Sequence, residues 1–84
     1  MTTVLVRYFA GARAAAGRTE ESVPLPAGST VADLISELRS RHGEQLTKVL
    51  PSCSYLLDGI AVRDTGQALD EGVDVDVLPP FAGG

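Results

Sequence analysis

The chain has 84 residues, 44% of them hydrophobic and 21% charged, which is enough for one domain with one core but leaves little room for a self-contained active site. Eleven acidic residues outnumber seven scattered bases, for a net charge of -4, so nucleic-acid binding, which needs clustered Lys and Arg, is not expected. No apolar run approaches the roughly 20 residues that cross a bilayer, and no secretion signal begins the chain, so we expect no membrane partner and a cytoplasmic location.

The first third of the chain predicts two strands with a short helix between them. A strand over Thr3–Phe9 alternates in polarity, and its core face is expected to carry Val4, Val6 and Tyr8. An alanine-rich helix over residues 10–16 is stopped by Gly17. A second strand follows over residues 21–25, and its proline suits an edge position.

The main helix is predicted to begin after Thr30, which is a good N-cap with Asp33 three residues on. One apolar stripe at i, i+3, i+4 and i+7 faces the sheet, formed by Val31, Leu34, Ile35 and Leu38. Gly43 supplies the stop. Another helical stretch over residues 44–50 is expected to end at Pro51.

The last third of the chain predicts three more strands. Residues 55–62 form a hairpin whose Asp58-Gly59 pair suits a type I′ turn. A final strand over residues 73–78 alternates strictly, with Val73, Val75 and Val77 on one face. This order implies an α+β domain over residues 1–78, with a mixed sheet of four or five strands packed on one main helix. Residues 79–84 are expected to form an extended, flexible C-terminal tail.

The candidate nucleophiles do not form a catalytic group. Cys53 is alone, which excludes an intrachain disulfide and a multi-cysteine zinc site, and we expect it to be a small, half-buried side chain. Ser52, Ser54 and His42 show no spacing that pairs a nucleophile with a base. His42 is interpreted as a solvated residue at a helix end. The chain is therefore not expected to be catalytic alone or to bind a metal or cofactor.

The last six residues carry the most specific chemistry of the chain. Gly84 bears an α-carboxylate with no side chain beside it, and Gly83 allows backbone conformations closed to other residues. Pro79 and Pro80 fix φ and offer no N–H donors, so the segment leaves the domain extended. Such an end can enter a narrow channel on another protein.

Three stretches together resemble the MoaD/ThiS family of ubiquitin-like, β-grasp sulfur carriers, most closely the MoaD type, the small subunit of molybdopterin synthase. They are residues 6–10 with Arg13 and Gly17, residues 28–34, and residues 77–84. The resemblance implies that an E1-like adenylyltransferase of the MoeB type uses ATP to adenylate Gly84, and that a sulfur donor then forms a thiocarboxylate. A large subunit of the MoaE type, in a heterotetramer, would pass this sulfur to cyclic pyranopterin monophosphate.

The resemblance also implies an apolar partner-binding patch on the open sheet face beside the tail. The matching positions are Phe9, Ala61 and Leu78, with Pro79, Pro80, Phe81 and Ala82 on the C-terminal tail. Ala61 is smaller than the leucine that such carriers can have there. Phe9 and Leu78 also fit an ordinary core, because a shift of one residue in the alternation exchanges the two faces of a strand.

Three other functions fit the same sequence. A sulfur carrier for cysteine or thiamine synthesis shares the fold, the diglycine and the activation chemistry. A ubiquitin-like modifier would instead join Gly84 to a lysine of a target through an isopeptide bond. A structural binding module would make no use of the diglycine.

Overall fold

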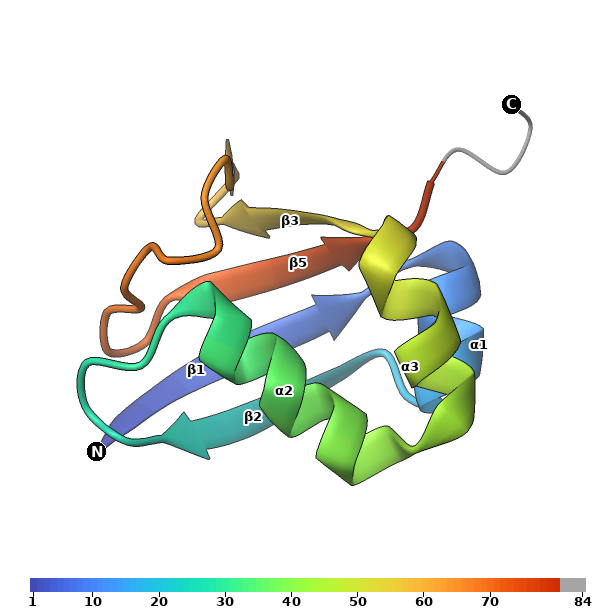
Figure 1. Ribbon diagram of the computed structural model, residues 1–84, viewed down its shortest axis with the longest axis horizontal. Helices are drawn as coiled ribbons and strands as arrows, with labels where there is room; N and C mark the ends of the chain where they lie inside the picture. Colours follow the sequence, from blue (N-terminus) through green and yellow to red (C-terminus); the bar gives the residue numbers. More distant parts are fainter. Residues whose placement is uncertain (81–84) are drawn as a thin grey trace.

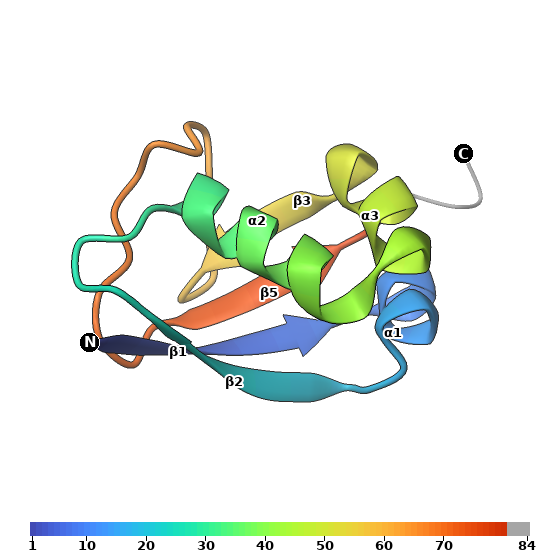
Figure 2. The same cartoon turned by 60° about the horizontal axis from the view of Figure 1, so that its bottom comes forward.

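The computed structural model describes residues 1–80, which form a mixed sheet with its main helix across one face (Figures 1 and 2). The strand order is β2-β1-β5-β3-β4; β1 and β5 are parallel, and every other neighbouring pair is antiparallel. The strands are β1 (Thr2–Tyr8), β2 (Glu20–Leu25), β3 (Ser54–Leu57), β4 (Ile60–Ala61) and β5 (Asp74–Leu78). The helices are α1 (Ala10–Ala16), α2 (Val31–His42), α3 (Glu44–Val49) and the 3-10 turn η1 (Leu50–Ser52). The predicted α+β, β-grasp architecture with four or five strands is confirmed, and the sheet within residues 1–80 has five.

The core lies between α2 and the sheet, and the alternation of the strands decides which side chains enter it. Val4, Val6 and Tyr8 of β1 are at most 2% exposed, and Val75 and Val77 of β5 are fully buried. Both predicted core faces are therefore confirmed. The odd-numbered residues of β1 and the even-numbered residues of β5 point to the other face, which no helix among residues 1–80 covers.

The start of α2 is fixed by a capping box. The Thr30 side chain accepts a hydrogen bond from the Asp33 backbone N–H at 3.3 Å, and the Asp33 side chain accepts one from the Thr30 N–H at 2.9 Å. Val31, Leu34 and Leu38 are fully buried. The predicted cap and the apolar stripe are confirmed, and Ile35 lies half-buried at the edge of the stripe.

The hairpin between β3 and β4 has the predicted type I′ character. Asp58 and Gly59 both have positive φ, 47° and 84°, as this turn requires. The Asp58 side chain also accepts a hydrogen bond from the Asp74 N–H at 2.9 Å. The turn is thus tied to the beginning of β5.

The helical stretch after Gly43 differs in detail from the prediction. α3 ends at Val49, and Pro51 lies inside η1 instead of terminating the helix. Proline is tolerated here because the first residues of a helical turn have no intrahelical acceptor for their N–H groups.

The interpretation of His42 as a solvated residue is wrong. Its side chain is 9% exposed and contacts the carboxylate of Glu21, whose side chain is only 4% exposed. The Tyr8 hydroxyl donates to the same carboxylate at 2.5 Å, and the Arg41 guanidinium lies 3.2 Å from its other oxygen. Helix α2 ends directly over the edge of the sheet, so His42 folds onto β1 and β2. The cluster of Tyr8, Glu21, Arg41 and His42 joins three elements.

Replacing Glu21 by Gln is expected to lower the free energy of unfolding by about 2 kcal/mol at neutral pH, because charge-assisted hydrogen bonds are lost from a buried site. Burial raises the pKa of Glu21, but hydrogen bonds from Tyr8 and His42 outweigh it and hold the pKa below its ordinary value. Folding therefore favours the carboxylate. Its stabilising contribution is present above the unfolded pKa and is lost as pH falls through the folded pKa.

Urea unfolding at neutral pH and at about pH 3 checks this prediction. The difference in the free energy of unfolding between wild-type and Glu21→Gln should decrease in acid, where the wild-type carboxyl is protonated and is as uncharged as the Gln amide. A difference that stays constant with pH would show that the charge of Glu21 does not contribute to stability.

Candidate functional site

The tail residues singled out by the sequence lie mostly outside the described residues. The structure does not describe Phe81, Ala82, Gly83 and Gly84. It does describe Pro79 and Pro80, which we call the base of the tail. β5 ends at Leu78, opposite Ser54 of β3. Pro79 has no N–H to continue the ladder, so strand pairing stops where the prolines begin.

Phe9 stands at the junction of β1, β5 and α1 with its backbone fully engaged. Its N–H donates to the Val77 carbonyl at 3.2 Å, and its carbonyl accepts from the N–H groups of Ala12 and Arg13 at 3.0 and 3.3 Å. The backbone is extended, with φ -123° and ψ 148°. The alternation of β1 therefore continues, and Phe9 points away from the core with 39% of its surface exposed. Its assignment to the open face is the one that the structure supports.

Leu78 and Ala61 lie on the same open face. Leu78 is half-buried and does not belong to the core cluster. Ala61 is exposed and pairs with Leu56 of β3, which in turn pairs with Asp76 of β5. Leu56 was missed by sequence reasoning, although the Asp-Gly turn fixes its register with Ala61. We call Phe9, Leu56, Ala61 and Leu78 the open-face patch.

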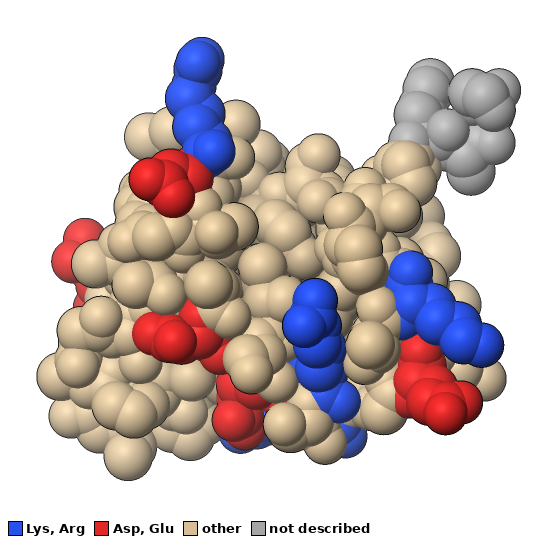
Figure 3. All heavy atoms as spheres, in the orientation of Figure 1, with Lys and Arg blue, Asp and Glu red and all other residues tan. Residues whose placement is uncertain are grey.

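Beside the open-face patch, the middle of the open face is acidic. Arg7 is flanked by Asp76 and Asp74 of β5, at 2.8 and 3.5 Å, and it is paired in register with Glu20 of β2. The hydrogen bond and charge of Asp76 raise the pKa of Arg7. Three carboxylates thus surround one guanidinium. On the helical side of the molecule the basic side chains stand apart (Figure 3), as their scatter in the sequence predicts.

Within residues 1–80, neither Cys53 nor His42 is placed as a reactive nucleophile or base. The Cys53 thiol donates to the Val49 carbonyl at 3.3 Å, and burial raises its pKa, which disfavours the thiolate. The His42 ring contacts the buried carboxylate of Glu21. Within residues 1–80, no three His, Cys, Asp or Glu side chains are placed to hold a metal ion, and no helix has the length and hydropathy to span a bilayer.

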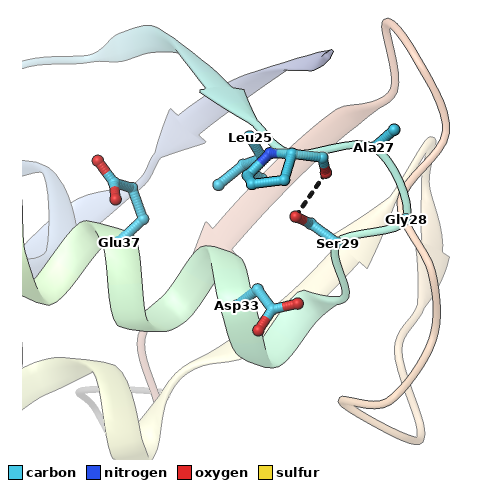
Figure 4. A pocket seen from close by; sticks show the side chains of 7 residues that line it. Leu25, Ala27, Gly28, Ser29, Asp33 and Glu37 are labelled. Carbon is cyan, nitrogen blue, oxygen red and sulfur yellow. Dashed lines mark hydrogen bonds between the residues drawn. The ribbon is translucent and has the colours of Figure 1, made fainter.

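A surface hollow of about 390 Å³ lies where β2 leads into α2 (Figure 4). The polar side chains around it already have partners: Ser29 donates to the Pro26 carbonyl at 2.6 Å, Asp33 caps α2, and Glu37 binds Arg41 at 3.0 Å. The hollow is also at the opposite end of the molecule from the end of β5 (Figure 1). It is therefore not part of the candidate site, which consists of the open-face patch and the base of the tail.

Comparison with known proteins bears on this site. The model of the ThiS family matches residues 6–84. A Chlamydomonas reinhardtii protein named molybdopterin synthase sulfur carrier subunit is 33% identical over 82 residues, which covers 96% of this chain and 98% of the relative.

Two solved structures extend the likeness to the fold. A Pyrococcus furiosus protein described as molybdopterin converting factor, subunit 1, superposes with a TM-score of 0.87 and 32% identity, covering 96% of this chain and 100% of the other. A complex of subunits 1 and 2 of the molybdopterin-converting factor from Helicobacter pylori contains a chain that superposes with a TM-score of 0.75 and 22% identity, covering 99% and 100%. This last likeness bears on the fold alone.

Proposed function

The chain belongs to the ThiS family, and from this premise we propose that it is a sulfur carrier, the small subunit of a molybdopterin synthase. The observation that carries the proposal is its likeness, along nearly the full length of both chains, to a relative named molybdopterin synthase sulfur carrier subunit. The family match also runs through Gly83 and Gly84, the residues to which we assign the chemistry.

The proposed chemistry begins with a poor electrophile. A terminal carboxylate is ionised at neutral pH, so an E1-like adenylyltransferase of the MoeB type would first join Gly84 to AMP, using ATP and releasing pyrophosphate. Hydrosulfide sulfur from a donor would then attack the acyl carbon and expel AMP. The product is a thiocarboxylate, whose sulfur is a soft nucleophile like a thiolate. In this proposal the carrier itself needs no bound cofactor, because ATP is used by the activating enzyme.

The large subunit, of the MoaE type, would receive this end and pass its sulfur to cyclic pyranopterin monophosphate. The geometry at the base of the tail supports this arrangement. Leu78 belongs both to the open-face patch and to the end of β5, so a partner that covers the patch also holds the start of the tail. An assembly of two small and two large subunits is the arrangement that we propose.

The prolines support delivery of the terminus into a partner. Pro79 and Pro80 have no N–H to donate to a β-ladder, so these two residues do not extend the pairing of β5 with β3. Pro80 is already exposed. We propose that the carrier works in the cytoplasm, where ATP for its activation is available.

The intact mass of the protein purified from its native host tests the proposal. We expect a species in which sulfur replaces one oxygen at Gly84, and this species should convert the pyranopterin when the large subunit is added. Sulfur without pterin turnover would favour a carrier for cysteine or thiamine synthesis. A ladder of larger conjugates without any thiocarboxylate would favour a ubiquitin-like modifier.

A further inference from the structure

The chain holds a single lysine, Lys48; its six other strongly basic residues are all arginine. This matters because an acyl adenylate can react with any amine that reaches it. An arginine guanidinium stays protonated in proteins and is not available as a nucleophile, whereas a lysine amine can attack acyl and carbonyl carbons. Apart from a chain-terminal amine, Lys48 is therefore the one amine that the protein offers.

The structure places Lys48 on a rigid support and leaves its side chain accessible. Lys48 is exposed on α3, and within residues 1–80 its ammonium has no ion-pair partner. The same helix is anchored by Leu46, which is fully buried, and is followed by Leu50, which is 1% exposed. The amine is presented to solvent from an element that the core holds in place.

Lys48 and the open-face patch belong to opposite layers of the molecule. α3 lies beside α2 on the helical side of the sheet (Figures 1 and 2), and its Leu46 joins the core between these layers. Phe9 and Leu78 face the other way. A carrier docked through its open-face patch therefore still exposes Lys48 to a second copy.

We infer that Lys48 is an acceptor site at which a second, activated copy of this chain acylates the protein. The inference rests on the proposed function, which supplies the activated Gly84. The bond between the Gly84 acyl carbon and the AMP phosphate oxygen breaks, the Lys48 amine forms an amide with that carbon, AMP leaves, and the amine loses a proton. The product is a dimer linked through an isopeptide bond, which forms when the sulfur donor is lacking.

The test uses the full chain carrying a thioester at Gly84, made by intein cleavage, so that no activating enzyme is needed. The thioester protein is incubated alone, and tryptic peptides of any dimer are sequenced by mass spectrometry. We expect a branched peptide that joins Gly84 to Lys48. In Lys48→Arg, which keeps the charge but removes the amine, this peptide should be lost. The control Arg63→Ala, which removes another exposed cation, should react like wild-type.

Any of the following results would overturn the inference: dimers of Lys48→Arg as abundant as those of wild-type, an equal loss of the branched peptide in the Arg63→Ala control, or a product that is only cyclised monomer. An unreacted thioester would also overturn it, provided that added hydroxylamine still cleaves the thioester. Because the thioester is installed chemically, none of these results bears on the proposed sulfur transfer, which the intact mass of the native protein decides separately.

Discussion

Removing Gly84, or extending the chain beyond it, is expected to abolish sulfur transfer while leaving the free energy of unfolding nearly unchanged. In the proposed mechanism, the transfer requires a carboxylate on Gly84 that can be activated and inserted into a partner. Stability has a different origin, because the core cluster within residues 1–80 extends from Val4 to Val77 and so ends before the tail begins. A change at Gly84 should therefore remove sulfur transfer without lowering the free energy of unfolding.

Intact mass, pterin turnover and thermal unfolding check this prediction on the same samples. A cleavable extension provides the matched control, since protease trimming back to Gly84 should restore both the thiocarboxylate and turnover. If an extended protein that is shown to be untrimmed still supports molybdopterin formation, Gly84 is not the sulfur-bearing residue.

Replacing Phe9 by Asp is expected to weaken binding to the large subunit by about 3 kcal/mol, roughly a hundredfold in affinity, because the interface would bury an unpaired charge. Phe9 is 39% exposed in the free chain and lies outside the core. Its three backbone hydrogen bonds do not involve the side chain. The folded state should therefore tolerate the substitution better than the complex does.

Calorimetric titration of the large subunit measures this loss, with Ala32→Asp as the matched control. Ala32 is exposed near the start of α2, on the helical side, so this variant acquires the same charge away from the patch. Its affinity should stay close to that of wild-type. Equal weakening by both variants would point to general repulsion of an acidic protein and remove Phe9 from the interface.

Much of the fold could be predicted because local signals and tertiary packing agree. The alternation of β1 and β5, the Thr30 capping box and the Asp58-Gly59 turn each specify their own backbone through nearby residues. Strand boundaries differ by one residue, as with β1, which begins at Thr2 and ends at Tyr8. Boundaries depend on where hydrogen-bonding partners end, and those partners are distant in sequence.

The buried cluster could not be predicted for the same reason. Glu21 and His42 are 21 positions apart, and each residue type, considered alone, is usually exposed to solvent. Only the placement of the end of α2 over β1 and β2 brings them together. The alternation of side chains along β2 gave one indication in the sequence, because it places Glu21 on the same face as Val23 and Leu25. A carboxylate on that face indicates a paired, buried charge.

The candidate site was predicted unevenly. The residues of the tail were singled out from their own chemistry, which does not depend on packing, and their role stays a prediction. Phe9 and Leu78 needed the register of β1 with β5 to assign their face, and Leu56 became visible only through its pairing with Ala61. A surface assembled from three strands is a property of the sheet, so no single stretch of sequence carries it.

The central place of β5 has a mechanical consequence. The strand that leads into the tail is hydrogen-bonded on both sides, to β1 and to β3. A pull on the tail along the strand would therefore load two ladders in shear, so that many hydrogen bonds resist together instead of opening one by one. The two ladders would therefore help the fold resist the force that the proposed mechanism applies to the tail, when the terminus is drawn into one partner and then withdrawn for another.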